Sequence, residues 1–202
     1  MVCVVVPSIG AGADGRGDFR LAPAGDKHII VDHQPIGVSV LVTPWNFPAA
    51  MATRKLAPAL AAGCTVVLKP ASETPLTSAY VVEVLRRAGV PAGVVNLVTP
   101  RPTGPAVSAM LHHPAVRKLS FTGSTEVGRQ LLHEAADTVL STSMELGGNA
   151  PFLVLPGADL DAAVEGALVA KMRNGGSACT SANRFYVHRT LHDDFARAMS
   201  EK

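Results

Sequence analysis

The sequence is short of cysteine, of charge and of aromatic residues, and the shortages exclude several classes of protein. Its 202 residues include only three cysteines, Cys3, Cys64 and Cys179, which are too few and too scattered for a disulfide framework. Only 17% of the residues are charged, and the net charge of +2 is too small to favour nucleic acid or a membrane surface as a partner. No cluster of Cys and His has metal-ligand spacing, so we expect no metal.

Hydrophobic runs that could cross a membrane are also missing. The uncharged stretch from 33 to 53 contains Pro35, Pro44 and Pro48, which argue against a membrane span. The apolar start of the chain has no Lys or Arg ahead of it, so it makes a poor signal peptide. We therefore expect the protein in a reducing, cytoplasmic compartment.

What the sequence does have is a regular alternation of β-branched runs and helical patterns. Residues 1–23 are rich in Gly, Ala and Pro and predict no regular structure. Strands are predicted at 29–32, 37–43, 65–68, 94–98, 118–121, 141–146, 152–155 and 184–187, and helices at 49–62, 77–88, 104–111, 124–136, 160–172 and 191–199. This order indicates right-handed βαβ units and an α/β fold with a doubly wound parallel sheet. In such sheets ligands bind at the carboxyl ends of the strands.

The stretch Phe121-Thr122-Gly123-Ser124-Thr125-Glu126-Val127-Gly128 places a glycine turn and a helix start after a strand. Ser124 is a good N-cap, and the N–H groups of a helix N-terminus can hold a phosphate. The glycine spacing is not G-x-G-x-x-G, and Arg129-Gln130 follow where a Walker A loop needs Lys and Ser or Thr. An ordinary strand–turn–helix with a serine cap explains this stretch equally well.

Three further strand ends each carry one polar residue. Lys69 follows a buried-strand pattern, Glu145 precedes paired glycines, and Asn46 lies in a loop pinned by two prolines. A lysine there can donate to ribose hydroxyls, a carboxylate can serve as general base, and a rigid amide can stabilise an oxyanion. Taken singly, each also fits a plainer reading: a snorkelling lysine, a solvated acid and a turn hydrogen bond.

Cys179 lies in a loop of small residues at the end of a helical pattern, in the run Lys171–Thr180. Glycines keep side-chain bulk away from such a thiol, so a ligand can approach it. Most free cysteines are instead small apolar residues packed in a core. The other motifs favour a reactive thiol here.

Together and in this order, these pieces resemble an NAD(P)-dependent aldehyde dehydrogenase. The matching stretches are 43–48, 61–70, 121–128, 144–149 and 173–184. The resemblance implies a Rossmann-like cofactor domain over 27–146 and the beginning of an α/β catalytic domain over 147–202, after an irregular segment over 1–26. It also implies that complete members, which are homo-oligomers, extend beyond both ends of this chain and hold there an oligomerisation strand and a glutamate for the nicotinamide ribose.

The resemblance assigns the chemistry to three residues. Cys179 would attack the aldehyde carbon to give a thiohemiacetal, whose oxyanion the Asn46 amide and the Cys179 N–H would hold. Hydride transfer to the nicotinamide would leave a thioester, and Glu145 would activate the water that hydrolyses it. Dividing one difficult oxidation into two steps is the general advantage of a covalent nucleophile.

The resemblance also implies the cofactor contacts. Lys69 would bind the adenosine ribose, Gly123 and Ser124 would meet the pyrophosphate, and Trp45 and Leu146 would line the nicotinamide path beside Asn46. Many NAD-preferring relatives carry glutamate at the position of Ser72. We therefore expect NADP, with NAD possible because Glu73 is adjacent.

Within the family, the chain looks most similar to succinate-semialdehyde dehydrogenases, in which two arginines hold the distal carboxylate of the small-molecule aldehyde. The matching residues are Arg54 and Arg173, and arginine suits a carboxylate because its donors are planar and always charged. The alternatives are a helix-surface arginine for Arg54 and a dipole-favoured cation for Arg173.

Two departures and two alternatives accompany the resemblance. Ser177 stands where the family usually has glutamine, and Ser181 stands where some relatives carry a second cysteine able to form a redox disulfide. A non-catalytic remnant that at most binds dinucleotide would explain the missing length. A coenzyme A-acylating dehydrogenase is the other alternative, and Glu145 argues against it because thiolysis can dispense with a water-activating base.

Overall fold

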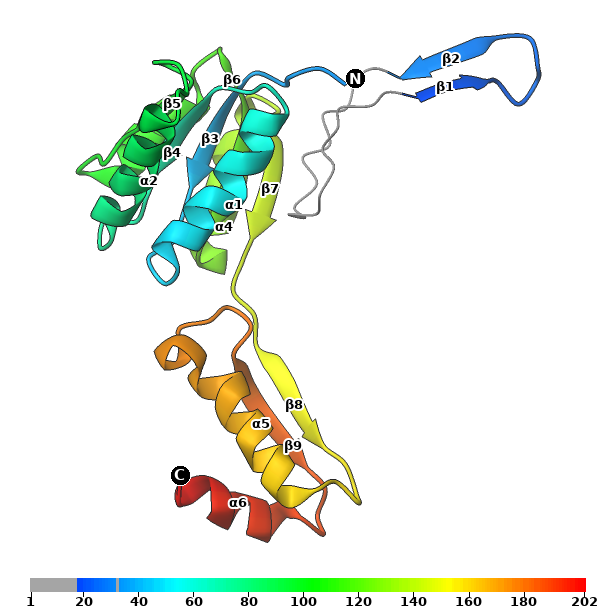
Figure 1. Ribbon diagram of the computed structural model, residues 1–202, viewed down its shortest axis with the longest axis vertical. Helices are drawn as coiled ribbons and strands as arrows, with labels where there is room; N and C mark the ends of the chain where they lie inside the picture. The colour runs from blue at the N-terminus through cyan, green and yellow to red at the C-terminus, as the bar shows by residue number, and fades with distance from the viewer. Residues whose placement is uncertain (1–17, 32) are drawn as a thin grey trace. The chain divides into compact units, whose positions relative to one another are not determined.

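The computed structural model describes residues 18–31 and 33–202 (Figure 1). The chain divides into two compact units, which we call the first unit, ending at Glu145, and the second unit, Leu146–Lys202. The sequence predicts a domain boundary one residue later, between 146 and 147. Every strand and helix predicted from the sequence is present, with each end within two residues of its predicted position.

The first unit contains a five-stranded parallel sheet in the order β5-β4-β3-β6-β7. Its strands are β3 (Val38–Val42), β4 (Val66–Lys69), β5 (Val95–Leu97), β6 (Val116–Thr122) and β7 (Ser141–Glu145). The chain builds outward from β3 to β5 and then returns to place β6 on the other side of β3. The predicted doubly wound topology is confirmed, and the strand order reverses between β3 and β6, where such folds bind ligands.

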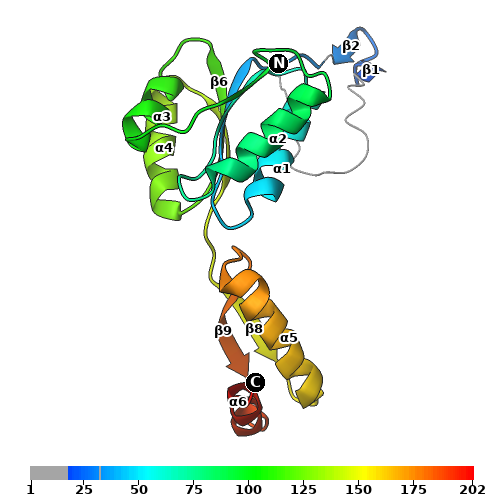
Figure 2. The same ribbon diagram turned by 60° about the vertical axis from the view of Figure 1, so that its left-hand side comes forward.

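Four helices cover the two faces of this sheet (Figure 2). One face carries α1 (Pro48–Ala61) and α2 (Pro75–Arg87), and the other carries α3 (Thr103–Leu111) and α4 (Thr125–Asp137). Helix α1 begins with a proline, which has the right φ and no N–H to satisfy, and it ends before Gly63, whose φ is +73°. The proline at the start and the glycine after the end can both be recognised in the sequence.

The core of the first unit follows from strand alternation and helical periodicity. The side chains of Leu41, Val66 and Leu68 point to the α1 face, where they pack on a stripe of α1 that consists of Ala52, Leu56 and Ala59. Burying one leucine completely contributes roughly 1.5–3 kcal/mol. The same register pairs Leu41 with Ser120, and Ser120 with Ser143. On this face the sheet therefore changes from apolar at β4 to polar at β6 and β7.

One prediction for the N-terminal region is wrong. Residues 18–21 form strand β1 (Asp18–Leu21), which pairs antiparallel with β2 (His28–Val31), although no regular structure is expected before Pro23. The turn between the strands is closed by the Ala22 N–H, which donates to the Lys27 carbonyl at 2.8 Å, and Gly25 supplies a φ of +72°. The rest of the predicted irregular segment, 1–17, lies outside the described residues.

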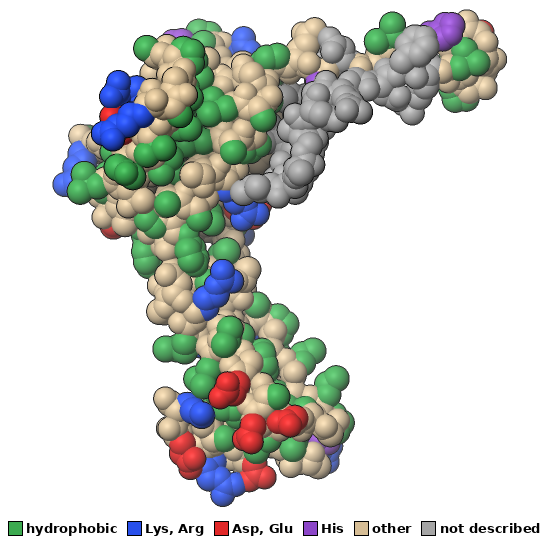
Figure 3. Space-filling view, in the orientation of Figure 1, with side chains coloured by type: hydrophobic (Ala, Val, Ile, Leu, Met, Phe, Trp, Pro, Cys, Tyr) green, Lys and Arg blue, Asp and Glu red, His purple; other side chains and the backbone are tan. Residues whose placement is uncertain are grey.

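The second unit contains a two-stranded parallel sheet of β8 (Ala150–Val154) and β9 (Ala182–Val187). Helix α5 (Leu160–Met172) connects the strands through the short turn η1 (Arg173–Gly176), and α6 (His192–Ser200) follows. Val154, Val164, Ala167 and Phe195 form its core. Hydrophobic side chains also reach the surface of both units (Figure 3). Among the described helices, none has the length and hydropathy needed to cross a membrane.

Candidate active site

The carboxyl ends of β4, β3, β6 and β7 adjoin at one edge of the first unit's sheet, and the predicted site residues of this unit lie at or beside that edge. Backbone hydrogen bonds join these ends. The Thr43 N–H donates to the Lys69 carbonyl at 3.1 Å, and the Gly123 N–H donates to the Glu145 carbonyl at 3.1 Å. The loop with Asn46 follows β3, beside the reversal of strand order.

The turn after β6 presents the N-terminus of α4. Ser124 is the N-cap, and its Oγ accepts a hydrogen bond from the Val127 N–H at 3.3 Å. Gly123 has no space for a side chain, because a Cβ there would lie 2.5 Å from the Phe121 ring. The N–H groups of the first helical turn have no acceptor within the helix, and the dipole makes this end positive. The turn therefore favours an anion.

Lys69 ends β4 on the opposite face from α1, because its partner Val42 alternates with Leu41. Its side chain is only 7% exposed. Burial lowers the pKa of Lys69, and the nearby Glu73 carboxylate acts in the opposite direction. Ser72 and Glu73 are both exposed in the turn that follows.

The loop after β3 holds Trp45 and Asn46 between Pro44 and Pro48. Asn46 is half-buried, whereas the indole of Trp45 is 52% exposed. The Phe47 carbonyl accepts from the N–H of the first turn of α1, so the loop is continuous with that helix. Two prolines and a helix start restrict the backbone around the amide.

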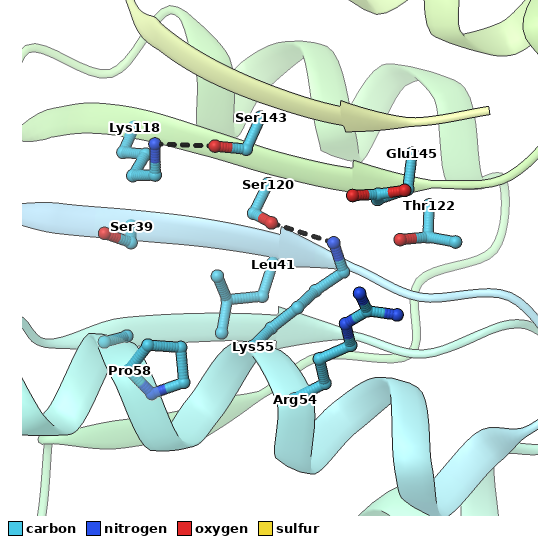
Figure 4. Close-up of a pocket in the computed structure, with 11 residues that line it drawn as sticks. Ser39, Leu41, Arg54, Lys55, Pro58, Lys118, Ser120, Thr122, Ser143 and Glu145 are labelled. Carbon is cyan, nitrogen blue, oxygen red and sulfur yellow. Dashed lines mark hydrogen bonds between the residues drawn. The ribbon is translucent and has the colours of Figure 1, made fainter. Parts of the chain in front are cut away.

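A pocket opens on the α1 face, over β3, β6 and β7 (Figure 4). Two predicted residues line it, Arg54 from α1 and Glu145 from the end of β7. Glu145 pairs in register with Thr122, so the two side chains point to the same face. The complete lining is Ser39, Leu41, Arg54, Lys55, Pro58, Ala59, Lys118, Ser120, Thr122, Ser143 and Glu145.

Two lysines of this pocket, Lys55 and Lys118, were not predicted from the sequence as site residues. The Nζ of Lys55 donates to Ser120 Oγ at 2.8 Å, and the Nζ of Lys118 donates to Ser143 Oγ at 2.9 Å and to Ser141 Oγ at 3.3 Å. The signal for Lys55 is its position within the buried stripe of α1, where a cation is out of place. For Lys118, the signal is the polar alternation along β6.

Burial dominates the electrostatics of Lys55. Desolvation lowers the pKa of its ammonium to about 8, and the positive charges of Arg54 and Lys118 add to this effect. Glu145 acts in the opposite direction. The pocket thus holds an amine that is only partly protonated in mildly alkaline solution.

In the second unit, Cys179 is exposed in the turn that follows η1. Asn174, Gly175 and Gly176 all have positive φ, so the chain reverses sharply there. The loop is fixed at Ser181, whose Oγ donates to the Gly176 carbonyl at 3.3 Å. The only other described cysteine, Cys64, is buried in the first unit.

The predicted residues therefore form two groups. Asn46, Lys69, Gly123, Ser124 and Glu145 share one edge of the first unit's sheet, with Trp45, Arg54 and Ser72 in the loops and the helix that follow its strands. Leu146, Arg173 and Cys179 belong to the second unit, where Arg173 is exposed at the start of the cysteine loop. Within residues 18–31 and 33–202, no three His, Cys, Asp or Glu side chains group as metal ligands.

The first group fits a dinucleotide by the chemistry of its donors. The α4 N-terminus offers backbone N–H groups to a pyrophosphate, and the glycine that precedes it is required by the close approach of Phe121. Lys69 adds a cationic donor at the end of β4, which is separated from β6 by β3. Both features suit a ligand that carries phosphates and ribose hydroxyls.

Comparison with known proteins gives a consistent result. A sequence model described as the aldehyde dehydrogenase family matches residues 9–202. The chain is 55% identical over 185 residues to a succinate-semialdehyde dehydrogenase (NADP+) of Escherichia coli, covering 92% of this chain and 38% of that protein. It is 56% identical over 175 residues to a glutarate-semialdehyde dehydrogenase of Pseudomonas putida, covering 87% of this chain and 36% of that protein.

A solved structure agrees with the sequence comparisons. A crystal structure of an NADP-dependent enzyme from Escherichia coli superposes with a TM-score of 0.89 at 54% identity, covering 93% of this chain and 39% of that chain. The chain thus spans less than two fifths of the length of these relatives.

Proposed function

This chain belongs to the aldehyde dehydrogenase family, and from that premise we propose that its residues serve the NADP-dependent oxidation of an aldehyde with a distal carboxylate, most specifically succinate semialdehyde. One observation carries the proposal. The Glu145 carboxylate, the Asn46 amide and the start of helix α4 lie at adjoining strand ends in the first unit, and the second unit presents an exposed thiol in a glycine-rich loop.

In the proposed reaction, the Cys179 thiolate attacks the aldehyde carbon and forms a thiohemiacetal. The Asn46 amide and the Cys179 N–H donate to the developing oxyanion, which is where preorganised donors lower a barrier most. A dinucleotide held by Lys69 and the α4 N-terminus would accept the hydride that leaves the thiohemiacetal carbon. Glu145 then removes a proton from the water that attacks this thioester and releases the carboxylate product.

The position of Glu145 supports its role as base. The carboxylate ends a strand and faces a pocket with three nearby cationic side chains, Arg54, Lys55 and Lys118. A carboxylate that faces a pocket can accept a proton from a water molecule held there. The thiolytic alternative, transfer of the acyl group to coenzyme A, leaves this side chain without a function.

The substrate class rests on Arg54 and Arg173. The relatives named above act, by their names, on succinate semialdehyde and glutarate semialdehyde, and both compounds carry a carboxylate at the end opposite the aldehyde. Arg54 lines the α1 pocket and Arg173 lies at the start of η1, and the guanidinium of each is a donor that suits a carboxylate. The two semialdehydes differ in length by one methylene. The arginines therefore explain the charge of the substrate more directly than its length.

The cofactor assignment rests on Lys69, Ser72 and the α4 N-terminus. Ser72 is small and neutral at the position where an acid would repel a 2′-phosphate. Glu73 acts on the charge of Lys69, so its carboxylate is close to the proposed ribose site. We therefore propose NADP as cofactor, with NAD accepted.

Thiol alkylation tests the proposal. Iodoacetamide should modify Cys179 rapidly and Cys64 slowly, because only the former is exposed. An excess of succinate semialdehyde should slow the labelling of Cys179, because the thiohemiacetal blocks the sulfur, whereas succinate should not. Alkylation of Cys64 first, or labelling of Cys179 that the aldehyde does not affect, would refute the assignment of the nucleophile. It would favour the non-catalytic remnant.

A further inference from the structure

The pocket on the α1 face contains a second group that can react with an aldehyde. Lys55 extends from α1 across the pocket toward β6, and the Arg54 guanidinium lies beside it (Figure 4). The oxidation proposed above gives the lysine no role. Its environment nevertheless differs from that of a structural lysine in three respects.

The first respect is its hydrogen bonding. Lys55 Nζ donates to a neutral hydroxyl, Ser120 Oγ, at 2.8 Å, and none of the ion pairs among the described residues includes Lys55. Buried ammonium groups are usually paired with a carboxylate. A hydroxyl can hydrogen-bond the neutral amine as well as the ammonium, whereas a carboxylate would favour the ammonium.

The second respect is the balance of charge around it. The side chain is only 8% exposed, and Arg54 and Lys118 place two further positive charges near it, against the single carboxylate of Glu145. Burial and these neighbours lower the pKa of Lys55 to about 8. The neutral amine is the nucleophilic form of lysine.

The third respect is access to the pocket. Lys55 and Arg54 are consecutive on α1, and both line the same cavity with the hydroxyls of Ser120 and Thr122. A guanidinium can hold a carboxylate while a neighbouring amine meets the other end of the molecule. Lys118, the other amine of the pocket, donates to the hydroxyls of two serines, Ser141 and Ser143.

We propose that Lys55 Nζ is a carbonyl-capturing amine that forms a reversible imine with short aldehydes bearing a distal carboxylate. The amine adds to the carbonyl carbon, the carbonyl oxygen takes up the proton that nitrogen releases, and loss of one water leaves the carbon–nitrogen double bond. Ser120 and Thr122 can hydrogen-bond the intermediate hydroxyl. The proposal rests on the proposed function only in assigning Arg54 to the carboxylate, and it needs neither Cys179 nor a dinucleotide.

The test is reductive trapping on the 202-residue chain carrying Cys179→Ala, so that no thiol competes for the aldehyde. The chain is incubated at pH 8 with succinate semialdehyde and cyanoborohydride, which reduces an imine to a stable secondary amine, and the modified lysines are located by peptide mass mapping. An amine with a pKa of 8 is about half neutral at this pH, against about 0.4% for a reference lysine. Crowding reduces that advantage, so we expect Lys55 to be modified at least about tenfold faster than the exposed Lys27 and Lys202.

Two matched variants and a second aldehyde make the result decisive. Lys55→Arg should abolish the fast modification, with circular dichroism used to verify its fold. Butyraldehyde, which lacks the carboxylate, should react more slowly at Lys55, and Arg54→Gln should remove that difference. Modification spread evenly over all lysines, or faster at Lys118 than at Lys55, would overturn the proposal. Equal rates for the two aldehydes would overturn the substrate class, whereas the iodoacetamide test of Cys179 stands apart from all these outcomes.

Discussion

The two units use the same parallel βαβ connection but complete it to different degrees. The parallel sheet of the first unit has five strands with helices on both faces, whereas the sheet of the second unit has two strands. In the second unit Leu153 pairs in register with Tyr186, and these side chains are 61% and 54% exposed. A sheet gains stability from neighbouring strands and from cover on both faces. The difference indicates that the first unit is a stable scaffold and that the second is marginal.

The buried charges follow the same division. Among the described residues, the buried lysines Lys55, Lys69 and Lys118 all lie in the first unit, and the buried polar residue of the second unit is Ser181. Burying a lysine costs desolvation free energy, and a unit with a large core can offset this cost. Dependence of stability on pH should therefore arise mainly in the first unit.

The difference between the two units should have its largest effect on catalytic turnover. We predict that the 202-residue chain forms NADPH from succinate semialdehyde at no measurable steady rate. The thiol lies in an exposed loop of the marginal unit, and a displacement of about 1 Å at a reacting atom can cost a hundredfold in rate. The measurement is an NADPH-formation assay with Cys179→Ala as control. Cys179-dependent turnover by a monodisperse sample would show that the second unit positions the thiol adequately.

The next prediction tests whether the cores of the two units unfold independently. Leu119→Ala removes a side chain that is 0% exposed in the first unit and should destabilise that unit by about 3 kcal/mol. Trp45 is the single tryptophan, so its fluorescence in a urea titration reports this unit. Phe195→Ala, in the second unit, should leave the Trp45 transition unchanged and speed hydrogen exchange of the α5 and α6 amides. An equal shift of the Trp45 transition by both variants would mean that the units unfold together.

The elements that could be predicted are those whose signal is local. The alternation of runs, the proline at the start of α1 and the glycine after it are enough to place strands and helices within two residues. Strand β1 was not predicted because its four residues lie among Gly, Ala and Pro. The strand forms by pairing with β2. Strand pairing is a tertiary contact, and the sequence of four residues alone does not reveal it.

The candidate site shows the same limit. The residues at strand ends could be named because strand ends in a parallel sheet share an edge. The polar pocket could not be named, because it depends on the register that places Ser120 opposite Leu41 and Ser143 opposite Ser120. A lysine within the apolar stripe of α1 becomes meaningful only once its hydroxyl partner on β6 is known.

The third prediction concerns Lys55 and pH. Its pKa falls from 10.5 to about 8 on folding, so the folded chain binds fewer protons than the unfolded chain between these values. Stability of the first unit should therefore rise with pH across this window, by no more than about 3 kcal/mol. Below pH 8 the amine is charged in both states and the cost of burying it is fully present. Lys55→Met should reduce the rise to the part that the buried Lys69 contributes, and Lys202→Met, an exposed change in the second unit, should not alter it.

The fourth prediction places cofactor binding in the first unit. NADP should bind at least as tightly as NAD, and Cys179→Ala should not change either affinity, as followed by quenching of Trp45. Glu73→Gln should favour NADP further, because it removes a negative charge that acts at Lys69. NAD binding that is tighter by tenfold, about 1.4 kcal/mol, would contradict the role assigned to Ser72.

The smallest effect is expected at the contact between α3 and α4. His112 Nδ1 lies 2.8 Å from the Ser108 carbonyl oxygen and its Nε2 lies 3.2 Å from Asp137 Oδ2, so the ring links the ends of the two helices. The hydrogen bond to the Ser108 carbonyl, and then the one to Asp137, raise the pKa of His112 above its usual 6.5. Protonation is thus more favourable in the folded chain, and the resulting stability is fully present below pH 6.5 and lost as the pH rises through the folded value.

We therefore expect His112→Gln to lower the melting temperature of the first unit slightly at pH 5.5 and hardly at all at pH 8.5. The exposed position of the ring keeps the effect small, because solvent screens its charge. Asp137→Asn is the matched control, since it keeps the shape of the partner and removes its charge, and it should reproduce part of the loss at pH 5.5. A larger effect at pH 8.5 than at pH 5.5 would mean that the neutral ring stabilises the two helices by packing and that its charge contributes nothing.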